Sequence, residues 1–286
     1  MERAFSLQDS GRSIAERKPG FYSKYCYELI SKTRIMKRQA IVIRKENSIR
    51  DIVLSDYRTA DIFLKYGIKF CCGGNLPLEQ VCTSMNIDVT EIVEELERAS
   101  TTIQIGNDIQ FQDWEPSFLS EFIVQVHHQH LKNSFPIVRG YVQLFLDSHQ
   151  SKYPDLKDLG ELIDQLTMET TVAMKDEEEI YFPYIKRIAH AFMRRESYGD
   201  LLMRTLRKPL KIIGTRNDSI KQLLNKIRLI TSDYVAPENS CVTHKVTFFN
   251  LNQLDTDIRQ HLYLENDILI PKAMQIEKEL IILNTP

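Results

Sequence analysis

A histidine and a glutamate near the C-terminus are spaced so that one metal ion can bind both. His261 and Glu265 are four residues apart, within the largely apolar segment from His261 to Pro271. Residues at this spacing share one face of an α-helix, and imidazole and carboxylate groups are both common metal ligands. The ordinary alternative is a solvated pair on a helix surface. The apolar neighbours favour a buried site over that alternative.

Three histidines among residues 127–130 offer a second group of ligands. His128 has Leu131 and Phe135 on its helical face, three and seven residues further along the chain. His127 lies on a less apolar stripe, so we expect His128 to be the one that points inward. A single inward histidine is more often a hydrogen-bonded core residue than a ligand, so His128 needs other ligands facing it.

The other acidic residues and histidines are weaker candidates. The run from Asp176 to Glu179 would normally form a solvated face, although one of its carboxylates can still turn inward. His149 lies 21 residues after His128, about 31 Å along a continuous helix, which is too far to bind the same ion. His190 and His244 have no partner at ligand spacing, and we expect both on the surface.

Two adjacent cysteines form a separate candidate site. Cys71 and Cys72 lie within the glycine-containing stretch from Gly67 to Asn75. Neighbouring cysteines are poor disulfide partners for each other because the geometry is strained. Exposed thiols or soft metal ligands are therefore one interpretation. The alternative is a tight turn with two half-buried cysteines that pack as small apolar residues.

The histidines and glutamates fall on segments with the apolar period of long helices. These predicted helices span about residues 117–148, 156–188, 206–232 and 243–282. Four long helices with short or medium connections indicate a bundle, and bundles build metal sites from inward histidines and glutamates on facing helices. We therefore predict an all-α chain with a four-helix bundle over residues 117–286.

Before the bundle, residues 40–100 predict a small module of four short helices that contains Cys71 and Cys72. A unit of this size has a thin core, so we expect it to lean on a neighbouring domain or to form a homodimer. Residues 101–116 are interpreted as a linker. Residues 1–39 are an N-terminal extension, either disordered or lying upstream of a true start at Met36.

Composition excludes several classes of function. The net charge of −2 gives no basic field, so nucleic acid is not an expected partner. No apolar run approaches the roughly 18 residues of a membrane helix, so we expect no membrane partner. The five cysteines are an odd number, and the N-terminus lacks the pattern of a secretory signal. These features predict reduced thiols in a cytoplasmic protein.

Residues 51–74, which end in Cys71-Cys72-Gly73-Gly74, resemble the N-terminal module of the iron–sulfur cluster repair di-iron proteins, or repair-of-iron-centres family. The C-terminal half resembles the hemerythrin-like bundle of the same family. The matching pieces are His127–Leu131, Lys175–Pro183, Pro237–Cys241 and His261–Pro271. The resemblance covers about residues 40–275.

This resemblance implies a non-haem di-iron centre inside the bundle. The family's ligand positions fall on His128 and His261, and on Glu177 and Glu265 as the two carboxylates that bridge the irons. The implied cofactor is therefore iron.

The same resemblance implies a role in restoring iron–sulfur clusters after damage by nitric oxide or peroxide. The protein would supply iron, as a donor or repair factor more than as a turnover enzyme. Its partners would be damaged iron–sulfur proteins or an assembly scaffold. Cys71 and Cys72 match the family's cysteine pair and are implied to handle iron or electrons.

Two positions depart from the family pattern. Ala173 and Asn217 stand where the family has histidine ligands. Alanine cannot ligate, and asparagine offers only a weak neutral oxygen. The remaining set could hold one iron, bind a second weakly, or be a metal-free relic that keeps the fold. The alternative function is accordingly a degenerate hemerythrin-like interaction protein with one metal or none. An oxygen sensor would need a complete iron pair, which this ligand set does not favour.

Overall fold

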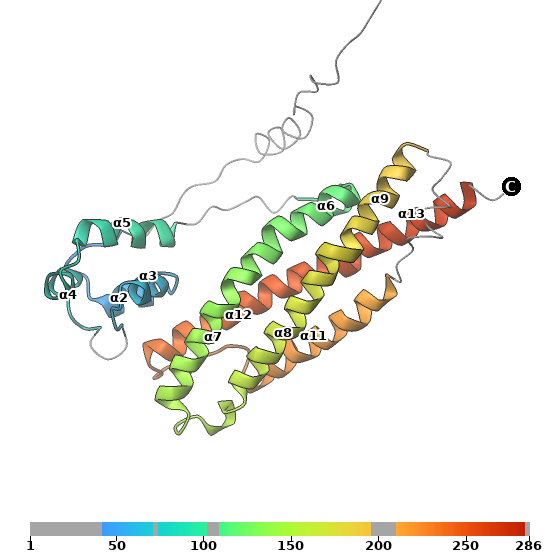
Figure 1. Ribbon diagram of the computed structural model, residues 1–286. Coiled ribbons are helices and arrows are strands. Elements are labelled where there is room, and N and C mark those ends of the chain that lie inside the picture. Colours follow the sequence, from blue (N-terminus) through green and yellow to red (C-terminus); the bar gives the residue numbers. More distant parts are fainter. Residues whose placement is uncertain (1–41, 71–73, 102–108, 196–209, 284–286) are drawn as a thin grey trace, which may run out of the picture. The chain divides into compact units, whose positions relative to one another are not determined.

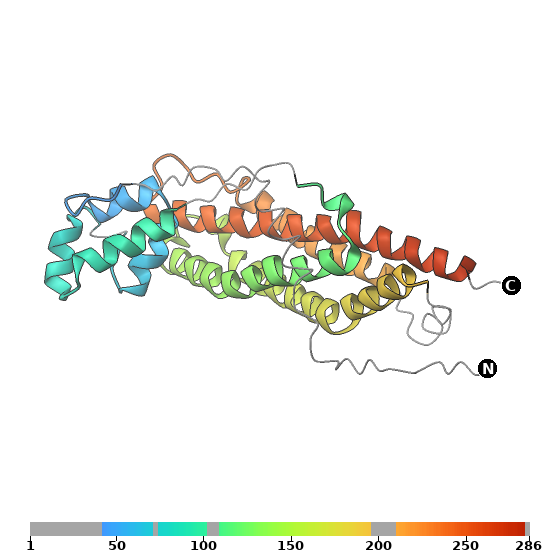
Figure 2. The ribbon, with the colours of Figure 1, turned by 90° about the horizontal axis from the view of Figure 1, so that it is seen from above.

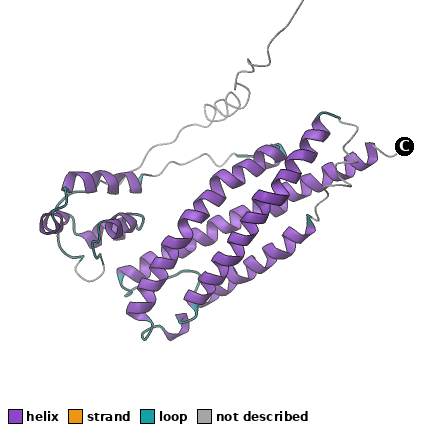
Figure 3. Cartoon of the chain, in the orientation of Figure 1, coloured by secondary structure: helices purple, strands orange, loops and turns teal. Residues whose placement is uncertain are grey.

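The computed structural model describes residues 42–70, 74–101, 109–195 and 210–283. Within these ranges the regular structure is helical and no strand is present (Figure 3). The predicted all-α class is therefore confirmed. None of the described helices combines the length and the apolar character that a membrane crossing requires. Cys71, Cys72 and the N-terminal extension lie outside the described residues, and the predicted domain boundaries stay predictions.

The N-terminal module contains four short helices: α2 Ile49–Ser55, α3 Thr59–Lys65, α4 Leu78–Met85 and α5 Val89–Ser100. Ser48 caps α2, because its side chain accepts a hydrogen bond from the backbone N–H of Asp51. Gly67 follows α3 with a φ of +69°, a left-handed conformation that glycine adopts without strain. Capping and turn residues thus set where these helices begin and end.

The core of the module is completed by residues from the C-terminal half. Its buried centre includes Phe63 and Phe70, and the same apolar cluster contains Tyr141, Val242 and Val246. The hydroxyl of Tyr141 also donates a hydrogen bond to the carboxylate of Asp61. The thin core expected from the length of the module is therefore supplemented by the neighbouring helices.

Long helices form the C-terminal half. The first comprises α6 Pro116–Phe122, η2 Ile123–His128 and α7 Gln129–His149, and the second comprises α8 Leu159–Asp176, η4 Glu177–Tyr181 and α9 Phe182–Met193. Then follow α11 Lys211–Ile230 and a last helix of α12 Val242–Tyr263, η5 Leu264–Leu269 and α13 Ile270–Leu283. Short 3₁₀ turns occur at Phe111–Asp113 and Pro154–Leu156.

Helices α7, α8, α11 and α12 pack as a four-helix bundle. Helix α7 contacts both α8 and α12, and α11 contacts the same two helices. The two views in Figures 1 and 2 show these helices running alongside one another. The predicted hemerythrin-like bundle is confirmed in this arrangement.

A polar layer separates two apolar clusters in the bundle. Leu131 and Leu262 belong to one cluster, and Ile123 and Leu264 belong to the other. Between these residues on the first helix lies His128, which is fully buried. The two clusters therefore surround the polar residues with close-packed apolar side chains, which exclude water and strengthen electrostatic interactions there.

Three of the helices that contribute to the polar layer contain a wide π-helical turn. These turns are η2, η4 and η5, and they contain His128, Glu177 and Glu265 respectively. Such turns are rare and occur frequently at functional sites. The occurrence of such turns on three separate helices indicates a functional site in this layer.

Candidate metal centre

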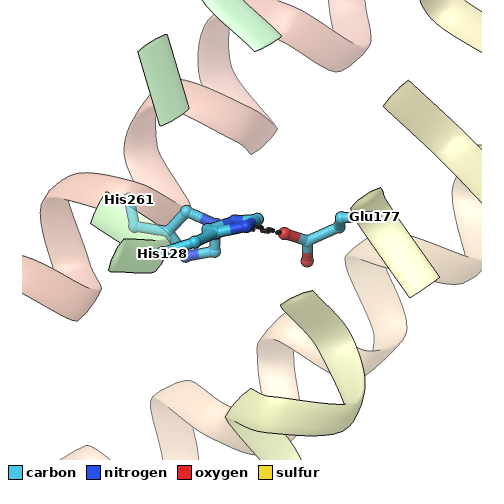
Figure 4. A group of neighbouring side chains, drawn as sticks. All are labelled: His128, Glu177 and His261. Atoms are coloured by element: carbon cyan, nitrogen blue, oxygen red, sulfur yellow. Dashed lines mark hydrogen bonds and ion pairs between the residues drawn. The ribbon is translucent and has the colours of Figure 1, made fainter. Parts of the chain in front are cut away.

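Three buried donor atoms from three different helical segments meet in the polar layer (Figure 4). The Nε2 atom of His128 lies 3.1 Å from Oε2 of Glu177, and the Nε2 atom of His261 lies 3.2 Å from the same oxygen. The two Nε2 atoms are themselves 3.2 Å apart. All three residues are at most 1% exposed. The arrangement is therefore a nearly equilateral triangle of two imidazole nitrogens and one carboxylate oxygen.

The size of this triangle fits a transition-metal ion. A point equidistant from the three atoms would lie about 1.8 Å from each, slightly less than the roughly 2.0–2.2 Å typical of metal bonds to histidine and carboxylate. His128, Glu177 and His261 would therefore be the residues that hold such an ion. Two imidazoles and a carboxylate are also the ligand set of many non-haem iron sites.

Unpaired polar atoms point to the same conclusion. Among the described residues, Glu177 Oε1, Glu265 Oε1 and His261 Nδ1 are buried and have no hydrogen-bond partner. Buried polar atoms are rarely left without a partner, because their desolvation costs free energy that nothing offsets. Several such carboxylate and imidazole atoms together fit a site built to hold a cation.

Electrostatics inside the triangle favour a positive charge. Burial alone would raise the pKa of Glu177, but the imidazoles of His261 and His128 hold it at about 2. Burial alone would lower the pKa of His261, but the carboxylate of Glu177 raises it overall. The Glu177 carboxylate therefore stabilises positive charge on the imidazole of His261. A bound metal cation would take that role.

Glu178 supports the outer side of His128. Its Oε1 atom lies 2.8 Å from Nδ1 of His128 and accepts a hydrogen bond of 2.8 Å from the ammonium group of Lys132. A carboxylate on the second ring nitrogen fixes the orientation and tautomer of a metal-binding histidine. Nothing in the sequence distinguished Glu178 from its acidic neighbours, so this role is visible only in the structure.

Glu265 is held by asparagine instead of by histidine. Nδ2 of Asn217 donates a hydrogen bond of 2.7 Å to Oε2 of Glu265, and both residues are fully buried. Burial and the nearby Glu177 carboxylate raise the pKa of Glu265 to about 8. The protonated form therefore prevails at neutral pH in the absence of an ion. A metal at this end of the site would have to displace that proton.

The second departure from the family pattern, Ala173, removes a donor atom from the site. Ala173 is buried one helical turn before Glu177, where its methyl group offers no donor atom. His128, Glu177 and His261 are thus the group of metal-binding side chains that the described residues bring together. Glu265, the fourth sequence-predicted ligand, lies close enough to Glu177 for that carboxylate to raise the pKa of Glu265, and it remains a candidate.

His127 is buried, although the sequence favoured His128 alone as the inward residue. Nδ1 of His127 lies 3.0 Å from Oδ1 of Asp257, and the residue is 2% exposed. The expectation assumed a regular helix, whereas both histidines lie in the wide turn η2, where neighbouring side chains are spaced differently around the axis.

The surface position expected for His244 is also wrong. Its ring is buried and packs at ring-centroid distances of 4.3 to 4.8 Å against Phe145, Tyr153 and Phe248. Helix α12 is surrounded by other helices over much of its circumference, so residues without a ligand partner can still lie inside. His190 is exposed, as expected.

Two family models match the chain. Residues 45–100 match a model described as ScdA_N, a domain of unknown function (DUF542). Residues 121–273 match the model of the hemerythrin HHE cation binding domain. The second match covers more than half of the chain and contains the triangle of His128, Glu177 and His261.

Several curated proteins are similar to the chain over most of its length. The iron-sulfur cluster repair protein ScdA of Staphylococcus haemolyticus is 26% identical over 231 residues, which cover 81% of this chain and 99% of that protein. The iron-sulfur cluster repair proteins YtfE of Edwardsiella ictaluri and an Enterobacter species are 25% and 27% identical, each over 80% of this chain and 97% of the relative. The matched bundle and its buried imidazole–carboxylate layer lead to one conclusion: the chain belongs to the hemerythrin HHE cation binding domain family.

Proposed function

We propose that this protein binds iron and takes part in the repair of iron–sulfur clusters damaged by nitrosative or oxidative stress. The observation that carries the proposal is the buried triangle of His128, Glu177 and His261, whose donor atoms are 3.1 to 3.2 Å apart. The names of the similar proteins support the repair role. A degenerate interaction protein without metal is not favoured, because it would have no need for these unpaired buried donors.

We further propose that the site holds one iron per chain. His128, Glu177 and His261 would be its ligands, and Glu265 would be a fourth, weaker one. A second iron would find an alanine at position 173 and would have to break the hydrogen bond from Asn217 to Glu265. Losing this buried bond costs about 1–3 kcal/mol before any new bond forms.

Iron held in this way is cargo that the protein can give up. Three protein ligands and a weaker fourth hold the ion loosely enough that a cluster under repair can compete for it. The chain's own residues control the exchange. Glu178 keeps the imidazole of His128 in place and is itself 28% exposed, so this outer support lies at the boundary with solvent. Cys71 and Cys72 are proposed as thiols that handle iron or electrons, and damaged iron–sulfur proteins as the recipients.

Metal analysis tests the binding part of the proposal. Protein produced with iron in the growth medium should contain about one iron per chain. His261→Ala should abolish iron binding, whereas His190→Ala, which removes an exposed histidine, should leave it unchanged. Circular dichroism and thermal melting show whether each variant remains folded. A folded wild-type chain that takes up no iron would rule out the proposal.

Reactivation of a damaged enzyme tests the repair part. An iron–sulfur dehydratase inactivated by nitric oxide should regain activity when the iron-loaded chain is added. His261→Ala should restore no more activity than buffer does. Free ferrous iron at the same concentration is the control, since reactivation by the salt alone would show that the protein adds nothing. Full iron loading without reactivation would retain the metal site and reject the repair function.

A further inference from the structure

A cysteine and a histidine meet where α7 ends and α12 begins. Sγ of Cys241 lies 3.0 Å from Nε2 of His149, the last residue of α7. Both side chains are half-buried. The two residues are 92 positions apart in the chain and are separate from the polar layer that holds His128 and His261. A thiol in contact with an imidazole can transfer its proton to the ring and become a thiolate.

The position of Cys241 at the start of a long helix favours the same proton transfer. Cys241 is the N-cap of α12, and its sulfur accepts a hydrogen bond from the backbone N–H of His244 at 3.4 Å. The unpaired N–H groups at a helix N-terminus carry partial positive charge, which stabilises an anion there. The helix and the imidazole therefore act on the sulfur in the same direction.

The other histidine near the sulfur, His244, does not accept the proton of the Cys241 thiol. His244 is 1% exposed, and neither of its ring nitrogens has a hydrogen-bond partner among the described residues. Burial, followed by the nearby His149 and Lys152, lowers the pKa of His244 to about 4. Its ring is therefore neutral at pH 7. His149 is left as the imidazole that can hold the proton of the Cys241 thiol.

We propose that Cys241 and His149 form a thiolate–imidazolium pair, and that Cys241 is a site of oxidation by hydrogen peroxide. The thiolate sulfur attacks one peroxide oxygen, the S–O bond forms and the O–O bond breaks. The sulfur is oxidised by two electrons to a sulfenic acid or its anion. The departing hydroxide takes the proton from Nε2 of His149 and leaves as water. Each reaction consumes one peroxide molecule and needs no other reactant.

Cys82 provides an internal comparison. It is buried at 1% exposure, and burial, followed by Asp88, raises the pKa of its thiol. A thiol in such surroundings stays protonated and unreactive at neutral pH. Among the described residues, Cys241 is thus placed for reactivity and Cys82 for packing, and both can be followed in the same sample.

Site-resolved alkylation tests the ion pair. The full chain is treated briefly with limiting iodoacetamide between pH 5 and 10, and the labelled peptides are quantified by mass spectrometry. Cys241 should titrate below the ordinary thiol value of about 8.5. At pH 7 its rate should fall by about tenfold or more in His149→Gln, whereas His190→Gln should match the wild type. Among the described residues, the imidazole of His149 contacts the sulfur, and His244, whose backbone N–H donates to it, is the other titratable residue.

Peroxide treatment tests the oxidation itself. A sulfenic-acid trapping reagent should label the Cys241 peptide in the wild type, more weakly in His149→Gln and not at all in Cys241→Ser. Melting curves of each variant show that the fold is retained. Equal alkylation rates in wild type and His149→Gln would overturn the ion pair. Absence of trapped Cys241 in the wild type would overturn the oxidation site.

Discussion

The side-chain amide of Asn217 donates a hydrogen bond of 2.7 Å to the carboxylate of Glu265. The bond joins α11 to η5 inside the bundle, and it occupies an oxygen that a second metal ion would need. On the neighbouring helix, Ala173 contributes no donor at all. Three donors thus converge closely, while one oxygen of the fourth predicted ligand, Glu265, is bound by Asn217.

Restoring both missing ligands should restore the second iron. In Ala173→His with Asn217→His, iron content should rise from about one to about two per chain, because two imidazoles replace a methyl group and a competing amide. Each single variant should bind less than the double variant. The larger side chain at position 173 should lower stability by about 1–3 kcal/mol through overpacking. The measurement is the number of irons per chain in folded protein. A double variant that still binds one iron would contradict the idea that Ala173 and Asn217 prevent binding of the second.

Removing the outer support of His128 should weaken metal binding without preventing it. Glu178→Gln removes the negatively charged carboxylate that lies beside Nδ1 of His128. The affinity for iron should therefore fall by about 10–100-fold. Glu179→Gln is the matched control, because it removes an exposed carboxylate from the same acidic run. Competition with a chelator of known affinity gives both values. Equal affinities would show that Glu178 has no part in orienting the ring.

The buried His244 should make the protein less stable in mild acid. Its pKa is about 4 in the folded chain and about 6.5 in an unfolded one. The unfolded chain therefore binds more protons as pH falls from 6.5 to 4, and the free energy of unfolding decreases over that range. Between pH 7.5 and 5 the loss from this residue should be about 2 kcal/mol.

His244→Phe should remove that loss while retaining the aromatic packing. Urea unfolding of the wild type and the variant at pH 7.5 and pH 5 measures the difference between the two slopes. His190→Ala, at an exposed position, should keep the slope of the wild type. An identical pH dependence for His244→Phe would mean that His244 has the same pKa in the folded and the unfolded chain.

Tyr141 should contribute to stability through its hydroxyl as well as its ring. It is buried, and its O–H donates to Asp61, whose pKa is raised by burial although this bond lowers it. Tyr141→Phe leaves that carboxylate without its donor and should cost about 1–2 kcal/mol. Tyr263→Phe changes a more exposed hydroxyl and should stay within about 0.5 kcal/mol of the wild type in chemical unfolding.

Helical periodicity was sufficient to predict the bundle, because long amphipathic helices repeat their apolar positions many times. The spacing of His261 and Glu265 pointed to a metal site for the same reason. The assignment of Glu177 within an acidic run depended on the family resemblance, since composition made all four residues equivalent. The geometry of His128, Glu177 and His261 places these side chains together, while the identity of the bound ion stays a prediction.

The incorrect expectations for His127 and His244 have physical causes. A regular helical period places His127 on a less apolar face than His128, but both residues lie in η2, which is a wide turn. The lack of a ligand partner in the sequence predicts a surface position for His244, whereas aromatic packing buries it. The contact between Cys241 and His149 joins residues 92 positions apart. No local pattern predicts such a pair, because it depends on how two helix ends meet in space.

The three wide turns suggest how such a centre could be lost without loss of the fold. A π-helical turn closes its hydrogen bonds over one more residue than an α-helical turn. Deleting a single residue from η4 would remove the residue that the wide turn absorbs, and would leave an uninterrupted α-helix whose flanking segments keep their faces. The side chains within the turn, Glu177 among them, would then point in other directions. Such a one-residue deletion would therefore abolish metal binding in a chain that still folds as a helical bundle.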